Sequence, residues 1–114
     1  MNILDKLSTI LPGASLGVMP DAPDTVTAIF EYEAELPKHS FDRTDISHGI
    51  QVRTRAATAA QAYALAKTAQ STLNRFTDGE ISVLQTTPIL DIGSDEKNPP
   101  RHEYTINFLV RRLY

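Results

Sequence analysis

The sequence predicts an α+β fold: a four-stranded, mostly antiparallel or mixed sheet with one long helix packed on one face and a short helix before it. Two observations predict this architecture. Four stretches alternate apolar and polar residues as strands do, and residues 58–76 repeat apolar residues with the period of an α-helix. The order along the chain is α-β-β-α-β-β. A helix and a sheet that are each apolar on one side bury those sides against each other.

Length and composition fit one globular domain over residues 1–114, with a helix-and-loop arm (1–24) and a sheet-and-helix core (25–114). Of the 114 residues, 41% are hydrophobic and 22% charged, close to globular averages. No apolar stretch reaches the roughly 18 residues of a membrane span, and the first residues lack the pattern of a secretory signal. We therefore expect a cytoplasmic protein. The absence of cysteine excludes disulfides, thiolate metal sites and cysteine nucleophiles.

A short helix is expected over residues 2–10, followed by a loop that runs to residue 24. Asn2 can cap this helix, and its apolar residues fall at helical spacing. The loop holds three prolines and two glycines, which leave no room for a regular element.

The first two strands are expected over residues 25–33 and 49–55. In the first strand, one side is expected to carry Val26, Ala28, Phe30 and Tyr32, with Ile29 as a misfit. Residues 34–47 form a polar connection that is long enough to be a functional loop. The second strand has a basic outward face.

Residues 58–76 form the strongest element, the long helix. Thr58 and Gln61 have the spacing of a capping box, in which each side chain bonds a backbone N–H of the other. The apolar stripe begins with alanines, so the helix can approach the sheet closely there. Asp78-Gly79 is expected to end the helix, because glycine tolerates the left-handed conformation at a helix end.

The last two strands are expected over residues 81–87 and 102–111. Pro88 lacks a backbone N–H, so the first of them ends there or runs along an edge of the sheet. Between the two strands, residues 91–101 are polar and are expected to form a long connection. The sheet face away from the helix is too polar to be core, and suits solvent or a wet interface.

Charge changes sign from block to block along the chain. The net charge is −5 over residues 1–48, +4 over 49–76, −4 over 77–100 and +2 over 101–114. Blocks of opposite charge can orient subunits head to tail in a ring. They also fit ordinary solvated faces.

No pattern in the sequence points to catalysis, a metal or a cofactor. His39, Asp42, Asp45 and His48 fall within ten positions, but their spacing matches no zinc or calcium motif. The carboxylates of residues 31, 33 and 35 lie along a strand edge, where charges more often block unwanted strand pairing than act as acids or bases. Nucleophile, phosphate-loop and metalloprotease motifs are missing. We expect that the protein is not an enzyme.

A basic patch is the remaining candidate site. If the second and fourth strands are neighbours, one face carries Arg53, Arg55, Arg111 and Arg112. Such a patch would contact an acidic partner or DNA passing nearby. The alternative is that these arginines are solvated and pair with local carboxylates.

The whole pattern resembles the minor capsid proteins of tailed bacteriophages that belong to the tail-completion and tail-terminator group. The resemblance covers most of the chain from residue 19 onward. It depends on the Pro-Asp before the strand ending in EYE, the strand IQVRTR, the helix with AYA and LN, the connection near residues 91–96, and the final strand closing on Arg111-Arg112.

This resemblance implies a structural virion protein at the head–tail junction. Members of the group terminate the tail tube and join it to head-side connector proteins, commonly as a six-membered ring through which DNA passes. It also implies assembly in the cytoplasm of the host bacterium. The alternatives are a head-side adaptor or other minor capsid component, and a small ligand-binding or enzymatic α+β domain. The loop residues expected to contact partner proteins are Asp42, Arg43, Asp45, Asp95, Glu96 and Lys97, followed by the four arginines above.

Overall fold

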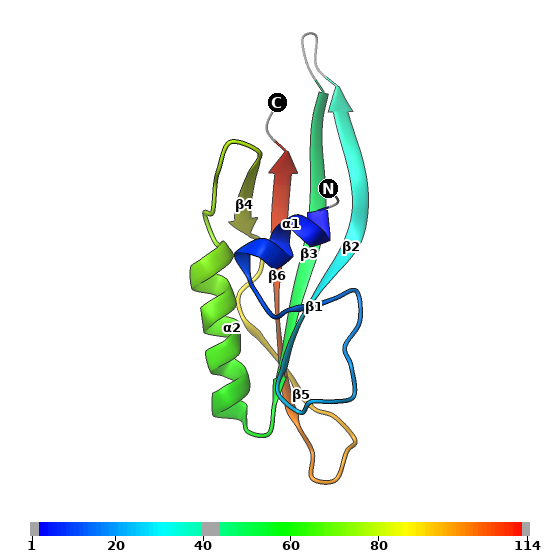
Figure 1. The fold of residues 1–114 in the computed structure, drawn as a ribbon, viewed down its shortest axis with the longest axis vertical. Coiled ribbons are helices and arrows are strands. Elements are labelled where there is room, and N and C mark those ends of the chain that lie inside the picture. Colours follow the sequence, from blue (N-terminus) through cyan, green and yellow to red (C-terminus); the bar gives the residue numbers. More distant parts are fainter. Residues whose placement is uncertain (1–2, 40–43, 113–114) are drawn as a thin grey trace.

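The molecule is a narrow sheet with both helices on one of its faces (Figure 1). The computed structural model describes residues 3–39 and 44–112 and measures about 55 × 21 × 21 Å. The two helices are α1 (Ile3–Ile10) and α2 (Ala59–Leu73). The strands are β1 (Ser15–Leu16), β2 (Val26–His39), β3 (Thr44–Ala56), β4 (Ile81–Gln85), β5 (Leu90–Ser94) and β6 (His102–Arg112).

The six strands form one sheet in the order β1-β2-β3-β6-β4. β1 pairs with β2 in parallel, and the other pairings are antiparallel. β5 also pairs with β6, opposite residues 102–105, while β4 pairs opposite residues 108–112. β4 and β5 therefore follow one another along the same side of β6, and β2 lies on the opposite side of the sheet.

The helix α2 packs closely on the sheet because its inner stripe is built from alanine. Ala62, Ala66 and Ala69 are fully buried, as is Leu73 at the end of the helix. The Thr54 hydroxyl on β3 donates a hydrogen bond of 2.9 Å to the Ala62 carbonyl, across the gap between sheet and helix. Thr58 caps the helix, as predicted: its side chain accepts from the Gln61 N–H at 3.2 Å.

One hydrophobic core lies between the sheet and the two helices. The inward side chains of β3 and β6 form its centre, with Ile50 opposite Phe108 and Val52 opposite Ile106. Ile3 and Leu7 of α1 belong to the same buried cluster. The N-terminal helix is therefore part of the core.

The structure corrects the predicted four-stranded sheet to a six-stranded one. The predicted loop over residues 11–24 contains β1, which is too short to show alternation. The polar connection over residues 34–47 is largely strand, because β2 runs to His39 and β3 starts at Thr44. Figure 1 shows this hairpin extending past the helices. Neither helix packs on its strands there, so they need no apolar face. The connection over residues 91–101 begins inside β5.

The predicted inner face of β2 is also wrong. Ile29, expected as a misfit, is fully buried in the core. Tyr32 is 52% exposed and lies over Gly49, where an added Cβ would come within 2.7 Å of the tyrosine ring. The ladder shifts register between Glu31 and Glu33, so a β-bulge interrupts the alternation.

The long helix ends earlier than its sequence suggests, and the chain then turns back along β4. Asn74 caps the helix and Arg75 has a positive φ of 64°. The Arg75 N–H then donates to the Val83 carbonyl at 2.9 Å, and the Val83 N–H donates to the Phe76 carbonyl at 2.8 Å. This segment covers the outer edge of β4.

Candidate functional site

The predicted contact residues of the first loop give little structural information. Asp42 and Arg43 lie outside the described residues. Asp45 lies in β3, opposite Lys38 in the ladder with β2.

The second predicted group lies in the turn between β5 and β6, and two of its three members hold the chain together. The Asp95 carboxylate accepts from the Arg101 backbone N–H at 2.9 Å and from its Nε at 2.7 Å. The Lys97 ammonium lies 3.0 Å from an Asp21 carboxylate oxygen. Glu96 is exposed.

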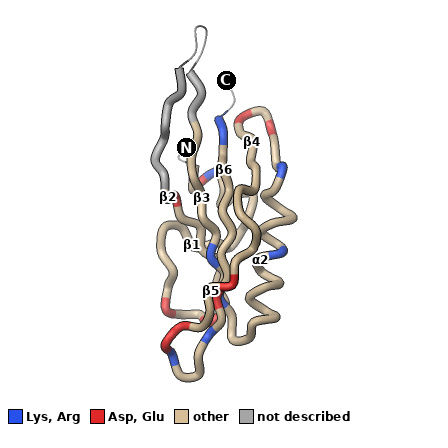
Figure 2. Tube along the Cα trace, turned by 180° about the vertical axis from the view of Figure 1, so that it is seen from behind, with Lys and Arg blue, Asp and Glu red and all other residues tan. Residues whose placement is uncertain are grey.

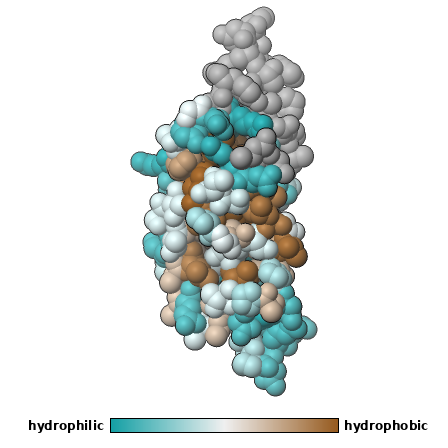
Figure 3. Space-filling model, in the orientation of Figure 1, coloured by the Kyte–Doolittle hydropathy of each residue, from teal (hydrophilic) through white to brown (hydrophobic). Residues whose placement is uncertain are grey.

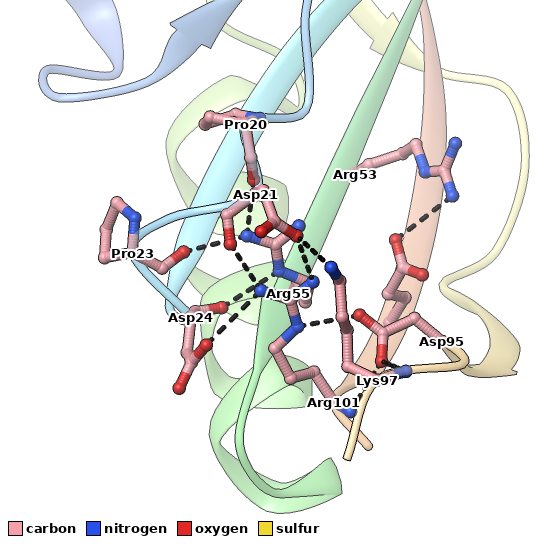
Figure 4. A network of polar contacts seen from close by, with 10 residues as sticks. Pro20, Asp21, Pro23, Asp24, Arg53, Arg55, Asp95, Lys97 and Arg101 are labelled. Atoms are coloured by element: carbon pink, nitrogen blue, oxygen red, sulfur yellow. Dashed lines mark hydrogen bonds and ion pairs between the residues drawn. The ribbon is translucent and has the colours of Figure 1, made fainter. Parts of the chain in front are cut away.

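Arg101, which the sequence analysis passed over, is the centre of this network. It is 6% exposed, and its guanidinium also contacts the carbonyl and carboxylate of Asp21 and, at 3.3 Å, the carboxylate of Asp24. Figure 4 shows these acidic groups converging on it from the arm and from the turn before β6. A signal was present in the sequence: an arginine directly after Pro99-Pro100, flanked by acidic segments.

Arg55 binds the same arm through backbone carbonyls. It is only 3% exposed, and it donates to the carbonyls of Pro20, Pro23 and Asp24 at 2.6, 2.8 and 3.1 Å. We refer to Arg55, Arg101, Asp95 and Lys97 with their partners on residues 20–24 as the arm clasp. It fastens the proline-rich segment to the lower end of the sheet.

The electrostatics of the arm clasp favour its charged forms. Hydrogen bonds from Lys97 and then Arg101 lower the pKa of Asp21. The backbone N–H of Arg101, followed by its guanidinium, lowers the pKa of Asp95. Burial opposes the charge on Arg101, but its bonds to Asp95 and Asp21 outweigh this and raise its pKa.

The four arginines do not form a single basic patch. Arg53 and Arg55 lie on the sheet face away from the helices, and the register places Arg111 on the same face but opposite Ser47, six residues further along β3. Arg112 lies on the helix face, where its Nε donates to His48 Nε2 at 3.1 Å. Arg53 is partly exposed and contacts Glu103 at 3.1 Å. Arg53 and Arg111 are therefore the members that remain accessible on the open sheet face.

His48 is a buried polar group rather than a loop histidine. It is 3% exposed, its Nδ1 bonds the Glu31 carboxylate, and its Nε2 accepts from Arg112. Within residues 3–39 and 44–112, no group of three or more potential ligands could hold a metal ion.

One hollow on the helix face lacks the side chains that catalysis needs. It has a volume of about 450 Å³ and lies between the arm, the start of β2 and α2. Its lining is made of leucine, proline, valine, threonine, serine and glycine, without a titratable side chain. Figure 3 shows apolar side chains gathered over the middle of this face and hydrophilic ones at its lower end. In the described part of the chain, no helix is long and apolar enough to cross a membrane.

The chain is a small α+β domain built on one six-stranded sheet, and the open edge of this sheet along β2 is a surface to which another chain can add. Comparison with protein families makes this specific: the family model described as "Bacteriophage tail terminator protein" matches residues 3–114. The chain belongs to the bacteriophage tail terminator family. It is a non-enzymatic structural protein of a virion tail.

Solved structures share the fold at low sequence identity. A chain from the virion of a native gene transfer agent particle is 16% identical and superposes with a TM-score of 0.65, over 93% of this chain and 83% of that one. A second solved chain is 13% identical, with a TM-score of 0.52 over 98% of this chain and 88% of that one. No curated protein matches the sequence.

Proposed function

We propose that this protein terminates the tail tube and joins it to head-side connector proteins as a ring of six copies in the virion, through which DNA passes. The observation that carries the proposal is the family match over residues 3–114, which leaves no other domain to supply a different activity within that range. Assembly would take place in the cytoplasm of the host bacterium, with the tail tube protein and the connector as partners.

The geometry supports a role in assembly. The sheet leaves one face without a helix, and the hairpin of β2 and β3 projects past the body of the molecule (Figure 1). Loops and projecting elements on a rigid scaffold are where recognition usually occurs. Of the predicted partner contacts, Asp45 lies in β3 within this hairpin, and Glu96 lies in the turn between β5 and β6 at the opposite end of the molecule. Asp42 and Arg43 are proposed as contacts from the sequence alone.

The deciding experiment is electron microscopy of lysates from a phage that lacks this gene. We expect filled heads beside separate tails, or tails of abnormal length, and restoration of normal particles when the gene is supplied in trans. Normal, infectious particles without the gene would overturn the proposal. Normal tails with empty or leaking heads would instead place the protein on the head side of the junction.

Surface variants separate the proposed contacts from the arm clasp. Arg53→Glu and Arg111→Glu change the open sheet face, and Glu96→Lys changes an exposed loop position. If these residues contact partners, each variant should fold normally and lower the yield of joined particles. An unchanged particle yield with all three would remove these positions from the interface.

A further inference from the structure

The two long sides of the sheet differ in whether their backbone is paired. β1 covers the outer edge of β2 only at Ala28 and Ile29, and among the described residues no strand pairs with that edge over residues 30–39. On the far side, the outer edge of β4 is closed by the segment after α2, through the bonds of Arg75 and Phe76 to Val83. We refer to residues 30–33 of β2 as the open edge, and to Arg75 with Leu84 as the closed edge.

The open and closed edges lie at the same height along the strands. Tyr32 packs over Gly49, Gly49 pairs with Leu109, and Leu109 pairs with Leu84. These residues therefore form one row across the sheet, on the face away from the helices. Arg75 joins the row because it bonds Val83, the neighbour of Leu84.

The chemistry of the two ends of this row is complementary. The open edge carries Tyr32, which is 52% exposed, whereas the Glu31 carboxylate before it lies on the helix face and bonds His48. The closed edge carries exposed Arg75 and Leu84, which line a shallow hollow of about 370 Å³ with residues 85–88. No acidic residue occurs between positions 49 and 76, and Figure 2 shows basic positions along α2, on the flank opposite β2.

We propose that neighbouring copies of this protein meet head to tail, with Tyr32 of one copy in the hollow between Arg75 and Leu84 of the next. The inference rests on the ring proposed above and specifies its contact surface. The tyrosine ring would contact the Leu84 side chain and the Arg75 guanidinium, which favours an aromatic face. Tyrosine and arginine are the residue types that most often dominate such interfaces.

Register and charge both favour this arrangement over a two-fold one. If two open edges paired with each other, Glu31 of one copy would lie beside Glu31 of the other, and like charges repel. Because the open and closed edges lie in one row, copies can meet through a rotation about an axis parallel to the strands, without a shift along it. Rotation without translation closes a ring, whereas a shift produces a filament.

The absence of cysteine from the sequence makes the contact directly testable. Single variants Phe30→Cys, beside Tyr32 on the open edge, and Thr86→Cys, beside Arg75 and Leu84 in the hollow, are prepared separately, then mixed and treated with a short homobifunctional maleimide, both as purified chains and as co-assembled tails. Both variants keep Tyr32 and Arg75, and the two cysteines lie in one row, because Phe30 pairs with Gln51, Gln51 pairs with Asn107, and the Thr86 N–H donates to the Asn107 carbonyl. We expect a cross-linked dimer in the mixture and none from either variant alone. The double variant carrying both cysteines should give a ladder of multimers, because each copy then links to two neighbours.

A matched control uses Ile92→Cys in place of Thr86→Cys. Ile92 lies on the same side of the sheet and is 45% exposed, but it belongs to β5, at a different height. It should not cross-link to Phe30→Cys. Circular dichroism should show each variant folded like the parent.

Cross-linking of Phe30→Cys with itself would overturn the proposal in favour of two-fold pairing. Absence of a product between Phe30→Cys and Thr86→Cys from both purified chains and assembled tails would overturn it as well. Either result can coexist with defective tails in the gene deletion, in which case the contact surface is wrong and the tail-terminating function stands. Normal particles in the deletion would reject the function itself.

Discussion

At the scale of single residues, the buried arginines determine how the arm is held. Residues 20–24 have few apolar side chains to bury, so the segment is fixed mainly by polar contacts. Arg55 satisfies three backbone carbonyls of the arm, and Arg101 binds its carboxylates. A guanidinium suits this task because it presents several donors in one plane. Alternation along β3 predicts the face on which Arg55 lies, but not that the arm folds over it.

Replacing Arg55 with methionine should destabilise the fold by about 3 kcal/mol, because three backbone carbonyls of the arm lose their donor. Chemical denaturation of the variant measures this loss. Arg53→Met is the matched control, two residues along the same strand and on the same face, with a single partly exposed ion pair to Glu103. It should change the free energy of unfolding by about 1 kcal/mol or less. Equal losses in the two variants would contradict the role assigned to Arg55.

Asp78 should make the stability of the protein sensitive to acid. Its carboxylate accepts from Lys6 and from the N–H groups of Glu80 and Ile81, which lowers its pKa to about 2 from 3.8. Because the pKa is lower in the folded state, the ionised carboxylate stabilises the fold. This stabilisation is complete above about pH 4 and is lost as the pH falls through about 2.

The free energy of unfolding, measured at several values of pH, tests this role of Asp78. The free energy of unfolding should fall between about pH 4 and pH 2, and Asp78→Asn should make that fall less steep. Glu96→Gln, at an exposed position, should keep the steepness of the parent protein. If Asp78→Asn leaves the pH dependence of the unfolding free energy unchanged, the role given to Asp78 is wrong.

At the scale of elements, α2 depends on small side chains along its inner stripe. Ala66→Leu should lower the free energy of unfolding by about 2 kcal/mol, since a larger side chain at a fully buried position forces the helix away from the sheet. Ala64→Leu places the same side chain on the exposed side of the helix and should change stability by about 0.5 kcal/mol or less. Thermal and chemical unfolding measure the free energy of unfolding of both variants. If Ala66→Leu is as stable as the parent protein, the helix does not approach the sheet so closely.

The elements that the sequence predicts well are those with one clearly apolar face. The cap at Thr58, the alanine stripe of α2 and the alternation of β6 each report a local rule, and the structure confirms them. β1 and β5 escape prediction because they are short, polar or exposed edge strands, positioned by the neighbour with which they pair. The inner face of β2 is predicted wrongly for another reason. Ile29 and Phe30 are adjacent and both apolar, so alternation alone does not show which of them points into the core.

The candidate contact residues were harder to predict than the elements. Arg55 contacts residues 20–24 and Arg101 contacts Asp21, although these residues lie far apart in the sequence. Such contacts depend on where the arm folds and could not be predicted from the sequence. The row that joins Tyr32 to Leu84 crosses β3 and β6, and it exists only once the strand order is known. The charge count along the chain did indicate a basic contact surface, because the charged residues of the block 49–76 are all basic.

At the scale of the whole molecule, a head-to-tail contact gives every copy two different surfaces, and this predicts how a defective copy behaves. A chain with Arg75→Glu keeps its open edge and can still add to a neighbour, but its own closed edge rejects the next copy. It should therefore block rings that contain it. If the ring holds six copies, as proposed, equal amounts of parent and variant should lower the number of rings made only of parent chains roughly 60-fold, and the titre of infectious particles should fall with it.

The double variant Tyr32→Ala with Arg75→Glu separates blocking from simple dilution. It has lost both surfaces, so it cannot enter a ring and should leave the titre of co-expressing cells near that of the parent. A two-fold interface would behave differently: Arg75→Glu would be harmless there, because Arg75 would lie outside the contact. A titre that falls with the single variant but not with the double variant indicates a heterologous ring. In such a ring each copy uses two different edges, and these must lie at the same height along the strands.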